Sequence, residues 1–199
     1  MRKEVNSSKR IVKQDLLLHT CCADCMLKIV NANESTYNFV LYMYNPNIHP
    51  RSEYSARLEA LKKVSEERGL KLSVADWSPK EYFGAVISSK NIESKNLTTD
   101  FYKKELRCGK CWRVRLEKSF QYATQKNILN LSTTLLSSKY QDSEMIVKIG
   151  ESLSKKYQIN FISDLKIEGD IENKGFYKQN YCGCVYSLNE RYEEKFLTS

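Results

Sequence analysis

Seven cysteines fall into three tight groups along this chain of 199 residues. The groups are Cys21, Cys22 and Cys25; Cys108 and Cys111; and Cys182 and Cys184. Clustered thiols are typical of metal or redox chemistry, whereas a disulfide scaffold more often scatters an even number of cysteines. The polar, basic segment 1–13 has no hydrophobic stretch of the kind found in a secretion signal. We therefore expect a reducing, cytoplasmic location in which the thiols stay available.

Each cysteine group has a spacing that suits a particular chemistry. The first follows a short apolar run, at a strand-to-helix turn where the free amides of the helix favour thiolate. Cys108 and Cys111 form a C-x-x-C pair, which can chelate one centre or take part in redox exchange. A disulfide between Cys182 and Cys184 would close a strained ring and would therefore be oxidising and labile. Asp24, between two cysteines of the first group, is either a helix N-terminal acid or a metal ligand or proton donor.

Two metal centres fit this set of thiols. A structural zinc site takes four ligands and would leave three of the seven cysteines unused. An iron–sulfur cluster is also held by about four thiolates. The spacing alone does not choose between these two.

The charge balance favours a polyanionic partner, since 32 Lys and Arg residues face 24 Asp and Glu residues. Much of the excess lies in the segment 103–118, which is either a solvated helix face or a phosphate-contacting surface beside the cysteines. His49 either packs in its loop against Pro46 and Pro50 or faces the site. Tyr54 and Arg57 share a helical face that is either a core edge or a pocket wall. The residues we predict to bind substrate are His49, Tyr54, Arg57, Arg107, Arg113, Arg115 and Tyr181.

Apolar runs and helical periodicity alternate along the chain. We expect strands at 16–19, 37–44, 70–77, 128–136 and 159–165, and helices at 24–30, 52–68, 102–126 and 143–157. Ser52 is a plausible N-cap, and Gly69 occupies a C-terminal helix position. This alternation predicts one α/β domain over 1–199, with a mostly parallel sheet covered by helices on both faces. No apolar run approaches the roughly 20 residues of a membrane span.

In such folds the functional site lies at the carboxyl ends of the strands. The first cysteine group follows the first strand, the segment 45–49 follows the second, and the segment 137–141 follows the fourth. We therefore expect these segments to converge at one edge of the sheet. The metal site would be built from the segments 19–25, 107–115 and 181–187.

Five ordered motifs between Leu16 and Ser187 resemble a known family. They read LLLHTCCADC, YNPNIHPRSEYSAR, RCGKCWRVRL, TTLLSSKYQ and GFYKQNYCGCVYS. The family is that of the epoxyqueuosine reductases that use no cobalamin. The chain departs from the pattern at Lys178, where an arginine is usual, and at Ser138-Lys139, where Ser-Pro is expected.

The resemblance implies an activity, a fold and a set of cofactors. The activity is the two-electron reductive removal of the epoxide oxygen of epoxyqueuosine, at the wobble position of tRNA, to give queuosine. The fold would be a nucleotide-hydrolase-like, Rossmann-like α/β fold. A [4Fe–4S] cluster would be held by Cys21, Cys22, Cys108 and Cys111. Cys182 and Cys184 would be a redox pair, and Asp24, Cys25 and Cys184 would be candidates for a second metal ion, iron or zinc. The partners would be tRNA and an external electron donor.

Two other functions are weighed against this one. An ATP-using tRNA thiolation or ligase enzyme would carry a glycine- and serine-containing phosphate loop after the first strand. That position holds Cys21-Cys22-Ala23-Asp24-Cys25 instead. The other alternative is a zinc-stabilised RNA-binding module without catalysis.

Overall fold

A parallel five-stranded sheet forms the centre of the protein in a computed structural model, which describes residues 12–87, 104–169, 175 and 177–197. The strands are β1 (Gln14–His19), β2 (Tyr37–Met43), β3 (Lys71–Val74), β4 (Asn130–Thr133) and β5 (Asn160–Phe161). Their order across the sheet is β3-β2-β1-β4-β5, and every pair is parallel. The α/β class and the parallel sheet predicted from the sequence are confirmed.

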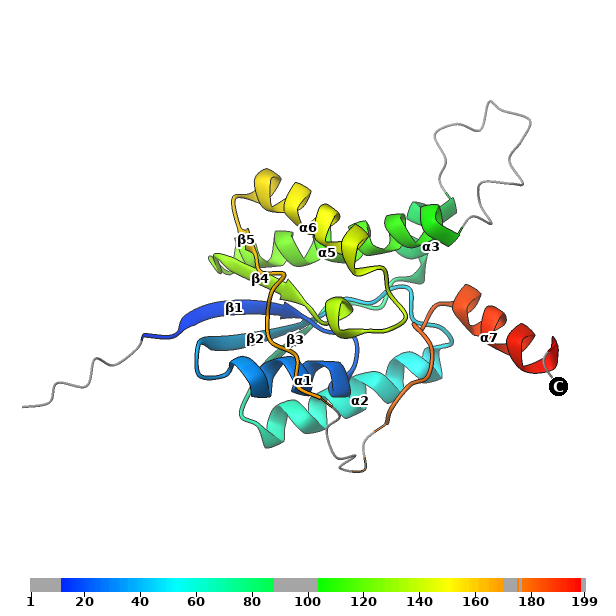
Figure 1. Cartoon of the computed structure of the whole chain (residues 1–199), viewed down its shortest axis with the longest axis horizontal. Helices are drawn as coiled ribbons and strands as arrows, with labels where there is room; N and C mark the ends of the chain where they lie inside the picture. Colours follow the sequence, from blue (N-terminus) through cyan, green and yellow to red (C-terminus); the bar gives the residue numbers. More distant parts are fainter. Residues whose placement is uncertain (1–11, 88–103, 170–174, 176, 198–199) are drawn as a thin grey trace, which may run out of the picture.

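Helices cover both faces of this sheet (Figure 1). On one side lie α1 (Ala23–Asn33) and α2 (Arg51–Glu67), and on the other lie α5 (Lys104–Gln125) and α6 (Ser143–Tyr157). Adjacent residues of a strand point to opposite faces. Leu17 accordingly packs with the core on the α5 and α6 side, whereas Leu16 and Leu18 pack with the core on the α1 and α2 side. This two-sided burial explains why β1 is an uninterrupted apolar run.

The central strand and the longer helices match the sequence-based prediction, whereas several boundaries differ. The prediction that Ser52 caps a helix is wrong, because α2 begins at Arg51 and Pro50 occupies its N-cap position. Gly69 follows α2 with a φ of +62°, as expected for a C-terminal glycine. The fourth strand is shorter than predicted, because the chain turns into the 3-10 helix η1 (Thr134–Ser137) directly after Thr133.

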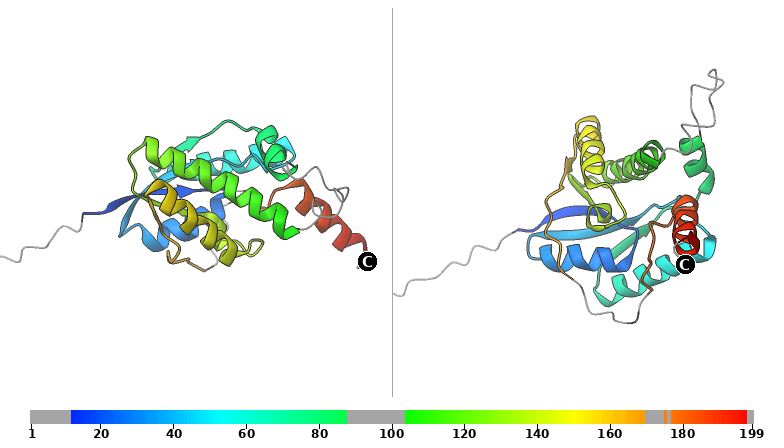
Figure 2. Two further views of the ribbon diagram at one scale, coloured as in Figure 1. Left: turned by 90° about the horizontal axis from the view of Figure 1, so that it is seen from above. Right: turned by 45° about the vertical axis from the view of Figure 1, so that its right-hand side comes forward.

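Two helices were not predicted. The helix α3 (Pro79–Ile87) packs beside α5, and α7 (Val185–Leu197) extends from the body of the molecule at its C-terminal side (Figure 2). None of the residues of α7 is buried. Within the described part of the chain, no helix is both long enough and apolar enough to cross a membrane.

Candidate active site at the switch point of the sheet

The first cysteine group lies where β1 and β4 end, side by side, at the centre of the sheet. The chain runs outward from β1 in one direction and returns to β4 on its other side, so this is the point at which ligands bind in open α/β sheets. The Cys21 amide donates a hydrogen bond to the Thr134 hydroxyl at 3.2 Å. Cys22 is the N-cap of α1, and its sulfur accepts a hydrogen bond from the Cys25 amide at 3.4 Å. The predicted position of these thiols at a helix N-terminus is confirmed.

The other two cysteine groups come together on the neighbouring side of the site. Cys111 of α5 and Cys184 lie in one buried cluster with Tyr82 of α3, and Cys182 packs against that cluster. The Cys182 and Cys184 sulfurs are 3.5 Å apart. All seven cysteines are free thiols, so the disulfide predicted for this pair is not formed here.

Arg115 lies in the interior between the two sets of thiols. Its side chain is 2% exposed, and its Nη2 donates a hydrogen bond to Asn45 Oδ1 at 2.6 Å. The Arg115 Nε has no hydrogen-bond partner, and no carboxylate forms an ion pair with this guanidinium among the described residues. The positive charge of Arg115 acts on a thiol of each set, because it lowers the pKa of both Cys21 and Cys111. Other effects, burial among them, are larger and raise both pKa values overall. A buried cation of this kind requires a compensating negative charge.

Burial keeps most of these thiols protonated at neutral pH. Desolvation raises the pKa of Cys108 to about 11 and that of Cys111 to about 12. The pKa of Cys21 is raised by its hydrogen bond with Cys22 and by burial. The pKa of Cys25 is lowered, chiefly by a hydrogen bond from Cys22. Because metal ions bind thiolates, loading a metal centre at the raised thiols would release protons.

A single contact between the Cys182 and Cys184 sulfurs shifts the pKa values of the two thiols in opposite directions. The contact between the two sulfurs lowers the pKa of Cys182 and raises the pKa of Cys184. The backbone amide of Ser187, in the first turn of α7, points at the Cys184 sulfur from 3.3 Å. Cys182 is therefore the thiol of the pair that ionises first as the pH rises.

The buried side chain of Arg57 is hydrogen-bonded to the backbone at the start of the Cys182-Gly183-Cys184 loop. The Arg57 side chain is 1% exposed and pairs with Glu53 through its Nε at 2.7 Å. The two Nη atoms of Arg57 donate to the carbonyl oxygens of Tyr181, at 3.3 Å, and Cys182, at 3.4 Å. This buried ion pair therefore fixes the backbone that carries both thiols.

The turn at His49 holds the same loop from a second direction. The His49 amide donates to the Gly183 carbonyl at 2.8 Å, and the Tyr181 hydroxyl donates to the His49 carbonyl at 2.8 Å. Gly183 has a φ of +108°, which only glycine adopts readily. A Cβ at Gly183 would lie 3.0 Å from Arg57 Nη2 and 3.1 Å from Ile48 Cγ1. The C-x-C spacer must therefore be glycine for the loop to sit this close to α2.

A cavity of about 380 Å³ opens onto the thiols of Cys108, Cys182 and Cys184. Lys104 and Arg107 of α5 form one wall, where both pair with Glu190 of α7 at 3.1 and 2.8 Å. The remaining lining residues are Lys139, Tyr140, Gln141, Asp142, Asn180, Tyr181, Ser187, Arg191 and Glu194. The segment 137–141 thus borders the site, as the sequence predicted.

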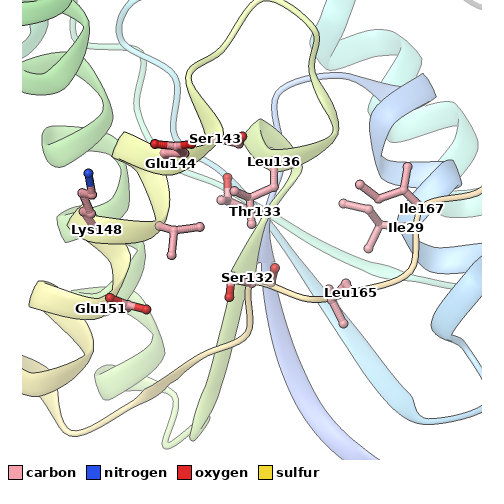
Figure 3. A pocket seen from close by; sticks show the side chains of 12 residues that line it. Ile29, Ser132, Thr133, Leu136, Ser143, Glu144, Lys148, Glu151, Leu165 and Ile167 are labelled. Atoms are coloured by element: carbon pink, nitrogen blue, oxygen red, sulfur yellow. The ribbon is translucent and has the colours of Figure 1, made fainter.

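A larger cavity, of about 550 Å³, contains no thiol (Figure 3). It lies between α6 and the segment after β5, with Leu136, Leu165 and Ile167 among its apolar lining and Glu144 and Lys148 on α6. We place the chemistry at the smaller cavity, because thiols line that cavity and none lines this one.

The predicted substrate-binding residues separate into three groups. Arg107 and Tyr181 line the thiol cavity. Arg113 is exposed on α5 and does not line it. Tyr54, Arg57 and Arg115 are buried in the interior. The His49 ring is half-buried and packs near the rings of Trp77, Tyr82 and Phe83. Tyr54, Arg57 and Arg115 thus lie in the interior, and their substrate-binding role stays a prediction.

Asp24, Cys25 and Cys184 are not brought together around a point where a single ion could be held. Asp24 instead lies between two lysines, with Lys28 at 3.7 Å and Lys178 at 3.6 Å. In the described part of the chain no three His, Cys, Asp or Glu side chains are arranged as a ligand set for a single ion. The second metal ion stays a prediction without support from this geometry, and we build no chemistry on it.

Several residues at the site carry no signal in the sequence. The phenol of Tyr82 is buried against Cys184, and burial followed by the nearby thiols raises its pKa far above the usual range. Asn180 and Arg191 line the thiol cavity. Tyr82 and Arg191 belong to α3 and α7, which were not predicted, so only the tertiary structure could reveal them.

Comparison with known proteins decides the family of this chain. The family model described as "Epoxyqueuosine reductase QueH" matches residues 16–190, which include all seven cysteines. The chain belongs to the epoxyqueuosine reductase QueH family. The resemblance seen in the sequence motifs is thereby confirmed, and so is the prediction that the chain is an enzyme, an oxidoreductase.

Curated relatives from several organisms carry the name epoxyqueuosine reductase QueH. The Thermotoga maritima protein is 33% identical over 90% of this chain and 93% of its own length. The Dehalococcoides mccartyi protein is 34% identical over 89% of this chain and 94% of its own. The Histophilus somni protein is 33% identical over 88% of this chain and 72% of its own.

A solved structure supports the fold alone. It is a crystal structure titled as a predicted subunit of tRNA methyltransferase from Methanocaldococcus jannaschii. It aligns over 89% of this chain and 88% of its own, with a TM-score of 0.52 and 15% sequence identity.

Proposed function

We propose that this protein reduces epoxyqueuosine in tRNA to queuosine at the cavity formed by Cys108, Cys182 and Cys184, with a [4Fe–4S] cluster held by buried thiolates. The family supports the reaction, since its relatives are named for it. The zinc-stabilised binding module without catalysis is set aside, because the chain belongs to a family of oxidoreductases.

The observation that carries the cluster is the buried guanidinium of Arg115. Its Nε lacks a partner, its Nη2 donates to the neutral Asn45, and its charge acts on the thiols of both Cys21 and Cys111. A cluster ligated by four thiolates is an anionic group, and it would supply the charge that Arg115 lacks.

The donor set also suits a cluster better than a single ion. Thiolates around a cluster bind different iron atoms, so their sulfurs need not converge on one point as zinc ligands must. Cys21, Cys22, Cys108 and Cys111 are our proposed ligands, and all four have raised pKa values. When bound, the cluster supplies electrons one at a time.

The protein's own dithiol balances the reaction. Converting the epoxide to an alkene takes two electrons and two protons and releases the oxygen as water. Oxidation of the Cys182 and Cys184 thiols to a disulfide gives up two electrons and two protons. The strain of a disulfide across one glycine makes it easy to reduce again, by an external low-potential electron donor. Arg57 holds the backbone at Tyr181 and Cys182, next to this dithiol.

The test is made on protein purified without oxygen. We expect a broad visible absorption band, with iron and acid-labile sulfide in amounts close to those of a four-iron cluster. We also expect conversion of epoxyqueuosine to queuosine in tRNA, followed by mass spectrometry of the digested nucleosides.

Three variants sharpen this test. Cys108→Ala should lose both the cluster and turnover, whereas Glu105→Ala, an exposed change on the same helix, should keep both. Cys184→Ala should keep most of the iron but lose turnover. A Cys108→Ala protein that still converts epoxyqueuosine would refute the cluster mechanism. Loss of the iron from Cys184→Ala would make Cys184 a cluster ligand instead.

A further inference from the structure

The thiol cavity carries polar and aromatic groups that neither the fold nor the thiols require. Tyr140 lines it with 40% of its side chain exposed, directly after the 3-10 helix that follows β4. The ammonium group of Lys139 lies 5.4 Å from the centre of the Tyr140 ring. An exposed aromatic ring with a cation beside it is a common platform for a nucleobase and its phosphate.

This platform is fixed relative to the thiols. The neighbouring Gln141 accepts a hydrogen bond at 2.6 Å from the indole of Trp112, which is buried on α5 next to Cys111. On its other side, Asp142 caps α6 through the Met145 amide at 3.0 Å. The loop that presents Tyr140 is therefore tied both to the helix that carries Cys108 and Cys111 and to α6.

Other polar side chains of the cavity have no hydrogen-bond or ion-pair partner within the described structure. The side chains of Lys139, Asn180 and Arg191 line the cavity, and none of them forms a hydrogen bond or an ion pair with another described residue. By contrast, Lys104 and Arg107 on the opposite wall are both engaged by Glu190. The two unpaired cations are thus available for phosphate, and the amide of Asn180 for the edge of a base.

We propose that this cavity binds one extruded nucleotide of single-stranded RNA, with its base stacked on Tyr140 and its flanking phosphates contacted by Lys139 and Arg191. A volume of about 380 Å³ is within the range of small-ligand sites and accommodates a single nucleoside but not a duplex. The base must leave its stack to reach the thiols, as enzymes that act on bases generally require. This proposal rests on the proposed function, because it assigns the cavity to the nucleotide that is reduced.

The experiment measures RNA binding and turnover on the complete protein. The probe is an anticodon stem–loop RNA with guanine at the wobble position for binding, and tRNA carrying epoxyqueuosine for turnover. Tyr140→Ala should raise both the dissociation constant for the stem–loop and the KM for the tRNA about ten-fold, because it removes the ring on which the base stacks. Tyr140→Phe keeps the ring and should stay within about two-fold of the wild type.

Two controls separate this role from a general effect. Tyr192→Ala removes an exposed tyrosine of α7 that does not line the cavity, and it should leave both constants unchanged. Lys139→Met should lower the slope of log affinity against log salt by about 0.7, the value for one phosphate of a single strand.

The outcomes distinguish the two proposals. Unchanged binding and KM in Tyr140→Ala, with a wild type that reduces epoxyqueuosine, would overturn the nucleotide site and leave the proposed function standing. A wild type that binds the stem–loop through Tyr140 but reduces nothing would support the site and refute the function. Guanosine monophosphate that binds as tightly as the stem–loop would overturn the assignment to single-stranded RNA.

Discussion

Replacing the glycine between the last two cysteines should disrupt the loop that carries them. A side chain at Gly183 has to adopt a φ of +108°, and its Cβ would meet Arg57 Nη2 at 3.0 Å and Ile48 Cγ1 at 3.1 Å. Backbone strain of this kind costs about 1–3 kcal/mol, and forced contacts in a packed region cost a similar amount. We therefore expect Gly183→Ala to lower the free energy of unfolding by about 2–4 kcal/mol.

The chain offers a matched control in its other cysteine–glycine segment. Gly109, between Cys108 and Cys111, lies within α5, and a Cβ there would have no heavy atom within 4 Å. Gly109→Ala should raise the free energy of unfolding by about 0.5–1 kcal/mol, because alanine is the better helix former. The two variants thus make the same chemical change, next to a site cysteine, with opposite expected signs.

The assay combines urea unfolding with thiol mapping, because the strained loop can also relieve its strain by leaving Arg57. Iodoacetamide followed by peptide mass spectrometry should show faster labelling of Cys184 in Gly183→Ala, while labelling of the equally buried Cys21 stays at the wild-type rate. If Gly183→Ala is as stable as the wild type and its Cys184 is no more reactive, the account of this loop is wrong.

Three further predictions follow from buried contacts. Arg57→Met leaves a buried carboxylate unpaired and should cost about 3–5 kcal/mol in urea unfolding, whereas Lys62→Met, an exposed change on the same helix, should cost less than about 0.5. Burial, and then the charge of Arg115, lowers the pKa of His19 to about 3. Between pH 7 and pH 5, His19 therefore binds a proton in the unfolded chain but stays neutral in the folded chain. The free energy of unfolding should fall by about 2 kcal/mol over this range, and by less in His19→Gln. Trp112→Phe removes the indole bond to the Tyr140 loop and should weaken RNA binding without loss of iron, measured by titration with the stem–loop.

The sequence predicts the sheet well because its strands are buried on both faces. Leu16, Leu17 and Leu18 are each inaccessible to solvent, and such a run has few other interpretations. The shortening of the fourth strand was not foreseeable, because Leu135 is as apolar as a strand residue but packs in the core from a 3-10 turn. The helix α7 is amphipathic, but none of its residues is buried in the core. A search for the apolar pattern of a core helix therefore does not find it.

The site was predicted in outline but not in the roles of its charged residues. The position of Cys21 to Cys25 after β1 follows from topology, and the structure agrees. Arginines are expected at surfaces, so nothing in the sequence places Arg57 and Arg115 in the interior. Both side chains also contact groups distant in sequence, since Arg57 donates to the loop carbonyls and Arg115 donates to Asn45.

The anchoring of the C-x-C loop by α2 also fixes the order in which the protein can mature. A chain emerges from the ribosome N-terminus first, so Arg57 and the first five cysteines are made before Gly183 exists. Until the loop has been synthesised, the Arg57 guanidinium cannot form its hydrogen bonds to the carbonyls of Tyr181 and Cys182. The cavity then also lacks the wall that carries Cys182 and Cys184. A long sequence separation makes such a contact late and slow to form. The cavity is therefore completed only after the segment 181–187 has been made, when the sheet that supports it can already have paired.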